Sequence, residues 1–205
     1  DTIYHEHFSY FSAVSVERLA ARHGLRIVDI EELPTHGGSL RVYLAHAASS
    51  HEPTASVARI IEAEKARNFL SLSGYQGFQD EVRTLKHELL ALLIQLKRDG
   101  KSIVGYGAPG KGNTLLNYCG IGPDFLDFTV DRNPYKHGRF TPGMRIPILA
   151  PKALDEARPD YVLILPWNIK TEIIRQLQHI KDWNGRFIVP VPRPEILSPG
   201  SEARP

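Results

Sequence analysis

Residues 102–118 read SIVGYGAPGKGNTLLNY. The first five of these residues are mostly apolar, as in a buried strand, and residues 113–118 have a helical pattern. Glycines and a proline separate the two segments and predict a tight turn between them. A strand, a glycine-rich turn and a helix in this order begin a βαβ unit, so the stretch predicts an α/β fold.

The same alternation continues toward the C-terminus. Further strands are predicted at residues 128–131, 161–165 and 186–190, and a helix at 171–180. The run YVLIL at 161–165 is typical of a strand that is covered on both faces of its sheet. Because strands and helices alternate, we expect a parallel sheet with right-handed crossovers over residues 101–190.

Residues before 101 have a different pattern. We expect a helix over 15–23, with Ser15 as its N-cap. Apolar strands at 25–30 and 40–44 flank a segment rich in turn residues, which together predict a β-hairpin. Between 49 and 99 the spacing of apolar residues predicts connecting helices, the longer one over 76–98.

The composition indicates an ordinary globular protein. The chain has 205 residues, of which 42% are hydrophobic and 23% charged, and its formal net charge is +2. This balance excludes disordered and collagen-like classes and gives no indication of nucleic-acid or membrane partners. The single cysteine, Cys119, can form no internal disulfide. Without a signal peptide or an apolar run of ~18 residues, we expect a cytoplasmic protein.

The start of the sequence indicates a longer parent protein. The chain has no initiator Met, and its one Met is Met144. It opens at Asp1 without a helix cap or a disordered lead-in. We therefore expect the chain to be a fragment of a larger protein.

The glycine-rich turn carries the sharpest candidate for chemistry. Gly105, Gly107 and Gly110 match G-x-G-x-x-G, and Lys111 follows the last of them. The turn also nearly matches a P-loop, but Gly112 stands where the magnesium-binding Ser or Thr would be, which disfavours nucleotide hydrolysis. One interpretation is a phosphate-binding turn with a cation beside it. The alternative is a turn whose glycines only allow close packing of strand and helix.

Residues that follow the predicted strands form a second group of candidates. Asp131 ends a strand where a ribose-binding acid of a dinucleotide site would lie, and residues 132–136 follow it. Trp167 comes just after another strand end, and His36 lies in the predicted hairpin turn. Each of these positions also has a purely structural interpretation, as a loop, a helix cap or a turn.

The segment Tyr4-His5-Glu6-His7 is the third candidate. His5 and His7 would share one face of an extended chain, a spacing that suits a metal pair, but no further cluster of ligands supports a metal. A histidine beside a carboxylate and a phenol also suits acid–base catalysis. The remaining interpretation is a solvated edge strand.

Several of these segments occur in the same order as in one known family. They are YHEHFSY at 4–10, LPTHGGSLR at 33–41, the turn and helix at 105–118, VDRNPYK at 130–136 and LPWN at 165–168. Together they closely resemble the C-terminal half of the sugar C-methyltransferases. That family transfers a methyl group from S-adenosylmethionine (SAM) to C3 of a nucleotide-linked 4-keto deoxysugar.

The resemblance implies an organisation in four parts. Residues 1–48 would be the C-terminal remnant of the SAM-binding catalytic domain, 49–100 connecting helices, 101–190 a Rossmann-like domain for the sugar nucleotide, and 191–205 an irregular tail. The family's SAM loop and zinc-binding segment would lie before Asp1, in the N-terminal half of the same protein. This part alone is therefore expected to be inactive and to hold no metal.

The resemblance also implies roles for single residues. His7 would be the base that removes the C3 proton, Glu6 would orient or polarise, and Tyr4 would donate a hydrogen bond to the sugar. In an ideal strand Glu6 and His7 point in opposite directions, so these roles require an irregular backbone. The nucleotide sugar, expected to be dTDP-linked, would be bound by His36, Gly105, Gly107, Lys111, Asn113, Asp131, Asn133, Tyr135 and Trp167.

Two functions of other classes remain open. One is a stand-alone module that binds a nucleotide sugar without catalysis. The other is an NAD-dependent oxidoreductase, indicated by the glycine-rich turn and Asp131. The position of Lys111 and the short sheet count against the oxidoreductase.

Overall fold

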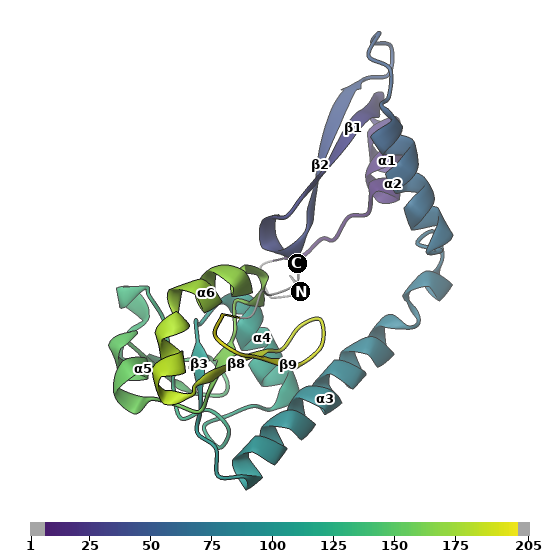
Figure 1. Ribbon diagram of the computed structural model, residues 1–205. Helices are drawn as coiled ribbons and strands as arrows, with labels where there is room; N and C mark the ends of the chain where they lie inside the picture. Colours follow the sequence, from purple (N-terminus) through teal and green to yellow (C-terminus); the bar gives the residue numbers. More distant parts are fainter. Residues whose placement is uncertain (1–6, 201–205) are drawn as a thin grey trace. The chain divides into compact units, whose positions relative to one another are not determined.

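A computed structural model describes residues 7–200 (Figure 1). The chain packs as two compact units, Asp1–Asp80 and Glu81–Pro205. The boundary falls within residues 49–100, so the predicted connecting helices are divided between the two units. Within the described residues, every helix is too short or too polar to cross a membrane.

The first unit contains a β-hairpin with two helices along it (Figure 1). Strand β1 (Leu25–Leu33) pairs antiparallel with β2 (Ser39–His46), and the short helix η1 (Thr35–Gly37) forms the turn. The hairpin prediction is therefore confirmed. The pairing register shifts between Ile27 and Asp29, where β1 has an irregularity.

Helix α1 (Ala13–Arg22) starts earlier than predicted. Its N-cap is Ser12, because Oγ of Ser12 accepts a hydrogen bond from the Ser15 amide and Oγ of Ser15 accepts one from the Ser12 amide. Ser15 is thus the third helical residue of a capping box, and the prediction of Ser15 as the N-cap is wrong.

Helix α2 (Ala55–Ala66) packs on the hairpin together with α1. Their shared core consists of seven buried apolar side chains: Ala13, Val14, Ile27, Ile30, Val57, Ile60 and Ile61. A short helix η2 (Leu72–Tyr75) follows, and α3 (Phe78–Arg98) begins at the end of this unit.

The second unit is built on a seven-stranded sheet with the order β5-β6-β4-β3-β7-β8-β9. The strands are β3 (Ile103–Tyr106), β4 (Thr129–Val130), β5 (Arg139–Phe140), β6 (Pro147–Leu149), β7 (Tyr161–Ile164), β8 (Arg186–Val189) and β9 (Glu195–Leu197). The five central strands are parallel, and the edge strands β5 and β9 are antiparallel to their neighbours. This order of the parallel strands is that of a Rossmann-like fold, as expected.

Helices connect the parallel strands. They are α4 (Gly110–Cys119), α5 (Lys152–Ala157) and α6 (Lys170–Gln176), with the short helices η3 (Pro134–Lys136), η4 (Trp167–Ile169) and η5 (Gln178–Trp183). The core includes Leu89, Leu93 and Leu96 of α3, and β7 is fully buried from Val162 to Ile164, which confirms the prediction of a covered strand.

Two further predictions of secondary structure are wrong. The helix predicted over 171–180 ends at Gln176 and continues as the 3-10 helix η5. The tail expected to be irregular contains β9, which pairs with β8 through residues 187–189. Prolines flank β9 closely and hide a strand of three residues from pattern analysis.

The strand order places a topological switch point between β3 and β7. From β3 the chain passes through α4 to β4 on one side, and it later returns to β7 on the other side. Ligands of open α/β sheets bind at such a point, beyond the carboxyl ends of the strands.

Candidate substrate-binding site

The loop after β3 is held by close packing. Gly107 has a φ of +84°, and a Cβ there would lie 2.7 Å from Cδ of Pro166. The Gly107 carbonyl accepts a hydrogen bond of 2.7 Å from Oγ1 of Thr129, which is buried. A Cβ on Gly105 would lie 2.6 Å from the same Thr129 oxygen. The packing alternative for these glycines thus has a physical basis, with or without a ligand.

A lysine side chain lies at the start of the helix that follows this loop. Helix α4 begins at Gly110 with Pro109 in the N-cap position, and no side chain caps this end. Nζ of Lys111 lies 5.4 Å from the ring centroid of Trp167, at the carboxyl end of β7. Trp167 is buried, and burial lowers the pKa of Lys111. The structure therefore brings Gly107, Lys111 and Trp167 together at the switch point.

The phenol of Tyr106 is a site feature that the sequence interpretation did not use. Tyr106 is the last residue of β3, and its side chain is largely buried beside the charges of Arg132, Asp131 and Glu172. Burial, the largest influence, raises the pKa of the Tyr106 phenol. Its place at the end of the central strand was the available signal.

Asp131 joins two loops of the sheet edge. Its Oδ2 accepts hydrogen bonds from the Ala108 amide (2.8 Å) and from Nζ of Lys136 (3.0 Å), and its Oδ1 accepts one from the Asn133 amide (2.8 Å). Burial, the largest single influence, acts to raise the pKa of Asp131. The hydrogen bonds from Asn133, Lys136 and Ala108 outweigh it, and the pKa lies below its ordinary value of 3.8.

This use of Asp131 bears on the NAD alternative. In a dinucleotide site the acid at this strand end binds a ribose hydroxyl. Both oxygens of Asp131 already accept hydrogen bonds from the protein, so the geometry favours a role in shaping the loop. Asn133 also acts locally, since its Oδ1 accepts the Tyr135 amide at 3.0 Å. The Tyr135 side chain is 82% exposed and accessible to a ligand.

A pocket of about 310 Å³ lies beside α4 in the second unit. Asn113 is the predicted site residue that reaches it, and Lys136 and Arg139 also line it, with Nζ of Lys136 paired with Asp131 at 3.0 Å. The sequence interpretation missed this pocket. Its lining residues are Ala108, Asn113, Leu116, Lys136, Arg139, Phe140, Thr141, Pro142, Ile148 and Leu165.

The N-terminal motif lies mostly outside the described residues. Tyr4, His5 and Glu6 are outside them, and so is the irregular backbone expected between Glu6 and His7. His7 is exposed on an irregular segment before α1, with its ring centroid 6.3 Å from that of Tyr10. Among residues 7–200, no cluster of three His, Cys, Asp or Glu side chains could hold a metal ion.

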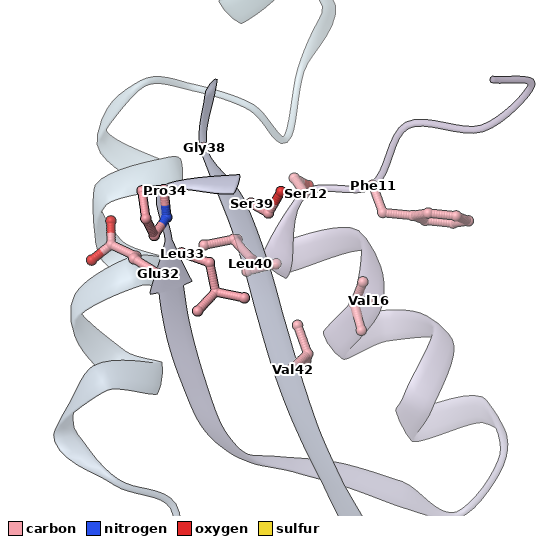
Figure 2. Close-up of a pocket in the computed structure, with 11 residues that line it drawn as sticks. Phe11, Ser12, Val16, Glu32, Leu33, Pro34, Gly38, Ser39, Leu40 and Val42 are labelled. Atoms are coloured by element: carbon pink, nitrogen blue, oxygen red, sulfur yellow. The ribbon is translucent and has the colours of Figure 1, made fainter. Parts of the chain in front are cut away.

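A larger pocket of about 700 Å³ lies in the first unit, between the start of α1 and the hairpin (Figure 2). Phe11 and Ser12 line it from the segment that follows His7, and Gly38 and Ser39 line it from the hairpin turn. The predicted site residue His36 lies in the same turn, within η1. His7 and His36 thus belong to the first unit, and the remaining predicted residues that the structure describes belong to the second.

Comparison with known proteins gives the family. Residues 34–192 match the C-methyltransferase C-terminal domain. The chain is 41% identical over 198 residues to the C-methyltransferase NovU of Streptomyces niveus, which covers 97% of this chain and 47% of that protein. The chain therefore spans about half the length of this relative. A solved structure, UDP-D-quinovosamine 4-dehydrogenase from Vibrio fischeri, is similar with a TM-score of 0.33 and 21% identity over 43% of this chain and 75% of that one. The family match and its extent identify the chain as a member of the C-methyltransferase family that carries its C-terminal domain.

Proposed function

We propose that this chain is the C-terminal part of a SAM-dependent C-methyltransferase that acts on C3 of a nucleotide-linked 4-keto deoxysugar. In this proposal the second unit anchors the nucleotide diphosphate and the first unit carries the base. The observation that carries the proposal is the position of Lys111 at the start of α4, against Trp167 and at the switch point of the sheet.

A diphosphate suits this position for electrostatic reasons. The N-terminus of an α-helix presents unpaired amides and a partial positive charge. Helix α4 has ten residues, no side-chain cap and no acidic residue in its first turn. Lys111 adds a positive charge in that turn, and Arg139 lines the pocket beside the same helix, where the charge of Lys136 is already paired with Asp131. A doubly charged phosphate chain would be stabilised by each of these features.

His7 is the proposed base. The proton on C3 is acidic because the neighbouring C4 ketone delocalises the charge that remains when it leaves. An imidazole can accept that proton near neutral pH. The exposed position of His7 allows a substrate to reach it. Glu6, next to it in the chain, is proposed to orient the imidazole, and Tyr4, three residues earlier, to donate a hydrogen bond to the sugar.

The described residues do not suit SAM itself. The sheet of the first unit is an antiparallel hairpin, so it has no parallel strand that a glycine-rich turn could follow. In the second unit both carboxylate oxygens of Asp131 already accept hydrogen bonds from the protein. We therefore place the SAM site in the part of the full-length protein that corresponds to the rest of NovU.

Replacing His7 in the full-length protein tests the proposal. We expect His7→Ala to lower the rate of methyl transfer to a dTDP-4-keto deoxysugar by about 10² or more, the usual size of a general-base contribution. The affinity for the nucleotide sugar should change little, because a different unit anchors it. The variant His46→Ala, which removes an exposed imidazole from β2, is the matched control. Unchanged turnover in His7→Ala would contradict the proposal.

A further inference from the structure

A carboxylate on α2 holds the start of α1. Oε1 of Glu64 accepts a hydrogen bond from the Ala13 amide and Oε2 accepts one from the Val14 amide, both at 2.8 Å. Both bonds are charge-assisted, and their two-pronged geometry restricts the direction as well as the distance. The negative charge also lies at the positive end of the helix. Glu64 is therefore a cap that comes from another helix.

The capping box completes this anchor. The amides of Ser12 and Ser15 are bound by each other's hydroxyl groups, at 3.0 and 3.2 Å. With the two bonds to Glu64, the four amides from Ser12 to Ser15 all have side-chain acceptors. The start of α1 is thus fixed in direction by its own serines and tied to α2 by Glu64.

The segment that carries the proposed base leads into this anchored end. Residues 7–12 have no helix or strand structure of their own, and they enter α1 at Ser12. Ser12 and Ala13 also line the 700 Å³ pocket, together with Gly38 and Ser39 of the hairpin turn. A shift of the α1 start would therefore move both the exit of the His7 segment and the pocket wall.

We propose that Glu64 is a positioning residue that sets where His7 meets the sugar. The inference rests on the proposed function, because it takes His7 as the base. The capping box by itself can begin the helix, whereas placing it takes contacts to other elements, which α1 has in the apolar core that it shares with β1 and α2 and in a directional polar contact. Glu64 supplies such a contact, since it lies on α2 and binds the backbone of α1.

A double-mutant cycle in the full-length protein tests the proposal. We expect Glu64→Ala to lower kcat about 10-fold with KM nearly unchanged, because a small misplacement of a catalytic group costs up to ~10² in rate. Glu64→Gln, which keeps a neutral acceptor, should fall between the wild type and Glu64→Ala. In the His7→Ala background, Glu64→Ala should cause no further loss. The control Glu62→Ala removes an exposed carboxylate from the same helix and should leave kcat unchanged.

The outcomes separate this proposal from the function on which it rests. Unchanged turnover in His7→Ala would contradict the proposed function and the positioning role together. A large loss in His7→Ala combined with unchanged kcat in Glu64→Ala, or with losses that simply multiply, would contradict the positioning role alone. If Glu64→Ala fails to fold, the same cycle with Glu64→Gln decides the question. Faster hydrogen exchange of the Ala13 and Val14 amides in Glu64→Gln would verify that the anchor has been weakened.

Discussion

Lys111 is the residue whose charge the proposed binding site depends on most. Its ammonium group lies against the Trp167 ring and is partly buried, so it is held in a limited region at the start of α4. We expect Lys111→Ala to weaken binding of thymidine diphosphate by roughly 1–3 kcal/mol, the scale of a lost charge-assisted hydrogen bond. The effect should decrease as salt rises, because the group is partly accessible to ions. Isothermal titration calorimetry on the chain measures the change in affinity and its dependence on salt.

The control for this measurement is Lys101→Ala. Lys101 precedes β3, at the amino end of the strand, and pairs with the half-buried Asp160 at 3.3 Å. Removing its charge should leave thymidine diphosphate affinity unchanged. Equal affinities of Lys111→Ala and the wild type, or tight binding of SAM without binding of the nucleotide, would contradict the assignment of the glycine-rich loop.

At the scale of residues, the sequence predicts what local spacing determines. The glycine-rich turn and Lys111 could be placed because a strand, a turn and a helix lie next to each other in the chain. The pocket beside α4 could not be predicted from the sequence, since Arg139 and Phe140 approach α4 only after β5 pairs with β6. The hydrogen bond from the Ala108 amide to Asp131 likewise depends on β3 and β4, which are neighbours in the sheet but far apart in sequence.

Two loops are linked at the carboxyl edge of the sheet, the one after β3 and the one after β4. The link is Asp131, which binds the Ala108 amide, together with Lys136, whose Nζ donates to the Ala108 carbonyl at 3.0 Å. We expect Asp131→Asn to lower the free energy of unfolding by roughly 1–3 kcal/mol at pH 7, because the amide nitrogen that replaces one carboxylate oxygen cannot accept a hydrogen bond and the negative charge that pairs with Lys136 is lost. Urea unfolding measures this difference.

The loss of unfolding free energy in Asp131→Asn should become smaller as the pH falls. The folded-state pKa of Asp131 lies below its ordinary value of 3.8. Protonation therefore favours the unfolded chain, and the stabilisation is complete above 3.8 and disappears as the pH falls through the lower, folded value. Asp127→Asn is the control, since the exposed side chain of Asp127 forms a long ion pair with Lys97 at 3.8 Å. A difference in unfolding free energy between Asp131→Asn and the wild type that stays constant between pH 7 and pH 3 would contradict this account.

At the scale of elements, length separates most of what could be predicted from what could not, although the two-residue strand β4 lies within the strand predicted over 128–131. Strands β1, β2, β3, β7 and β8 and helices α2 and α3 have enough apolar residues to show their period. The strands β5 and β9 and the helix α5 have two, three and six residues, and their pairing partners or packing define them. Their prediction would need the sheet order, which no local pattern contains.

At the scale of the whole molecule, the chain has two separate cores. Buried core residues of the first unit lie between Ala13 and Ile61, and those of the second lie between Leu89 and Val189. The four-part division implied by the family resemblance remains a prediction, because this packing does not test it. It treats residues 49–100 as one connection, whereas α2 belongs to the first core and α3 to the second.

The independence of the two cores can be tested by dividing the chain before α3. We expect residues 78–205 to fold alone and to unfold cooperatively, because that fragment retains all of α3 and every buried residue of the second core. It should bind thymidine diphosphate as tightly as the whole chain, since Lys111, Trp167 and the pocket beside α4 lie within it. Residues 1–77 keep only the seven-residue core and should give no cooperative transition by circular dichroism. An affinity of fragment 78–205 more than about 10-fold weaker than that of the chain would place part of the nucleotide site in the first unit.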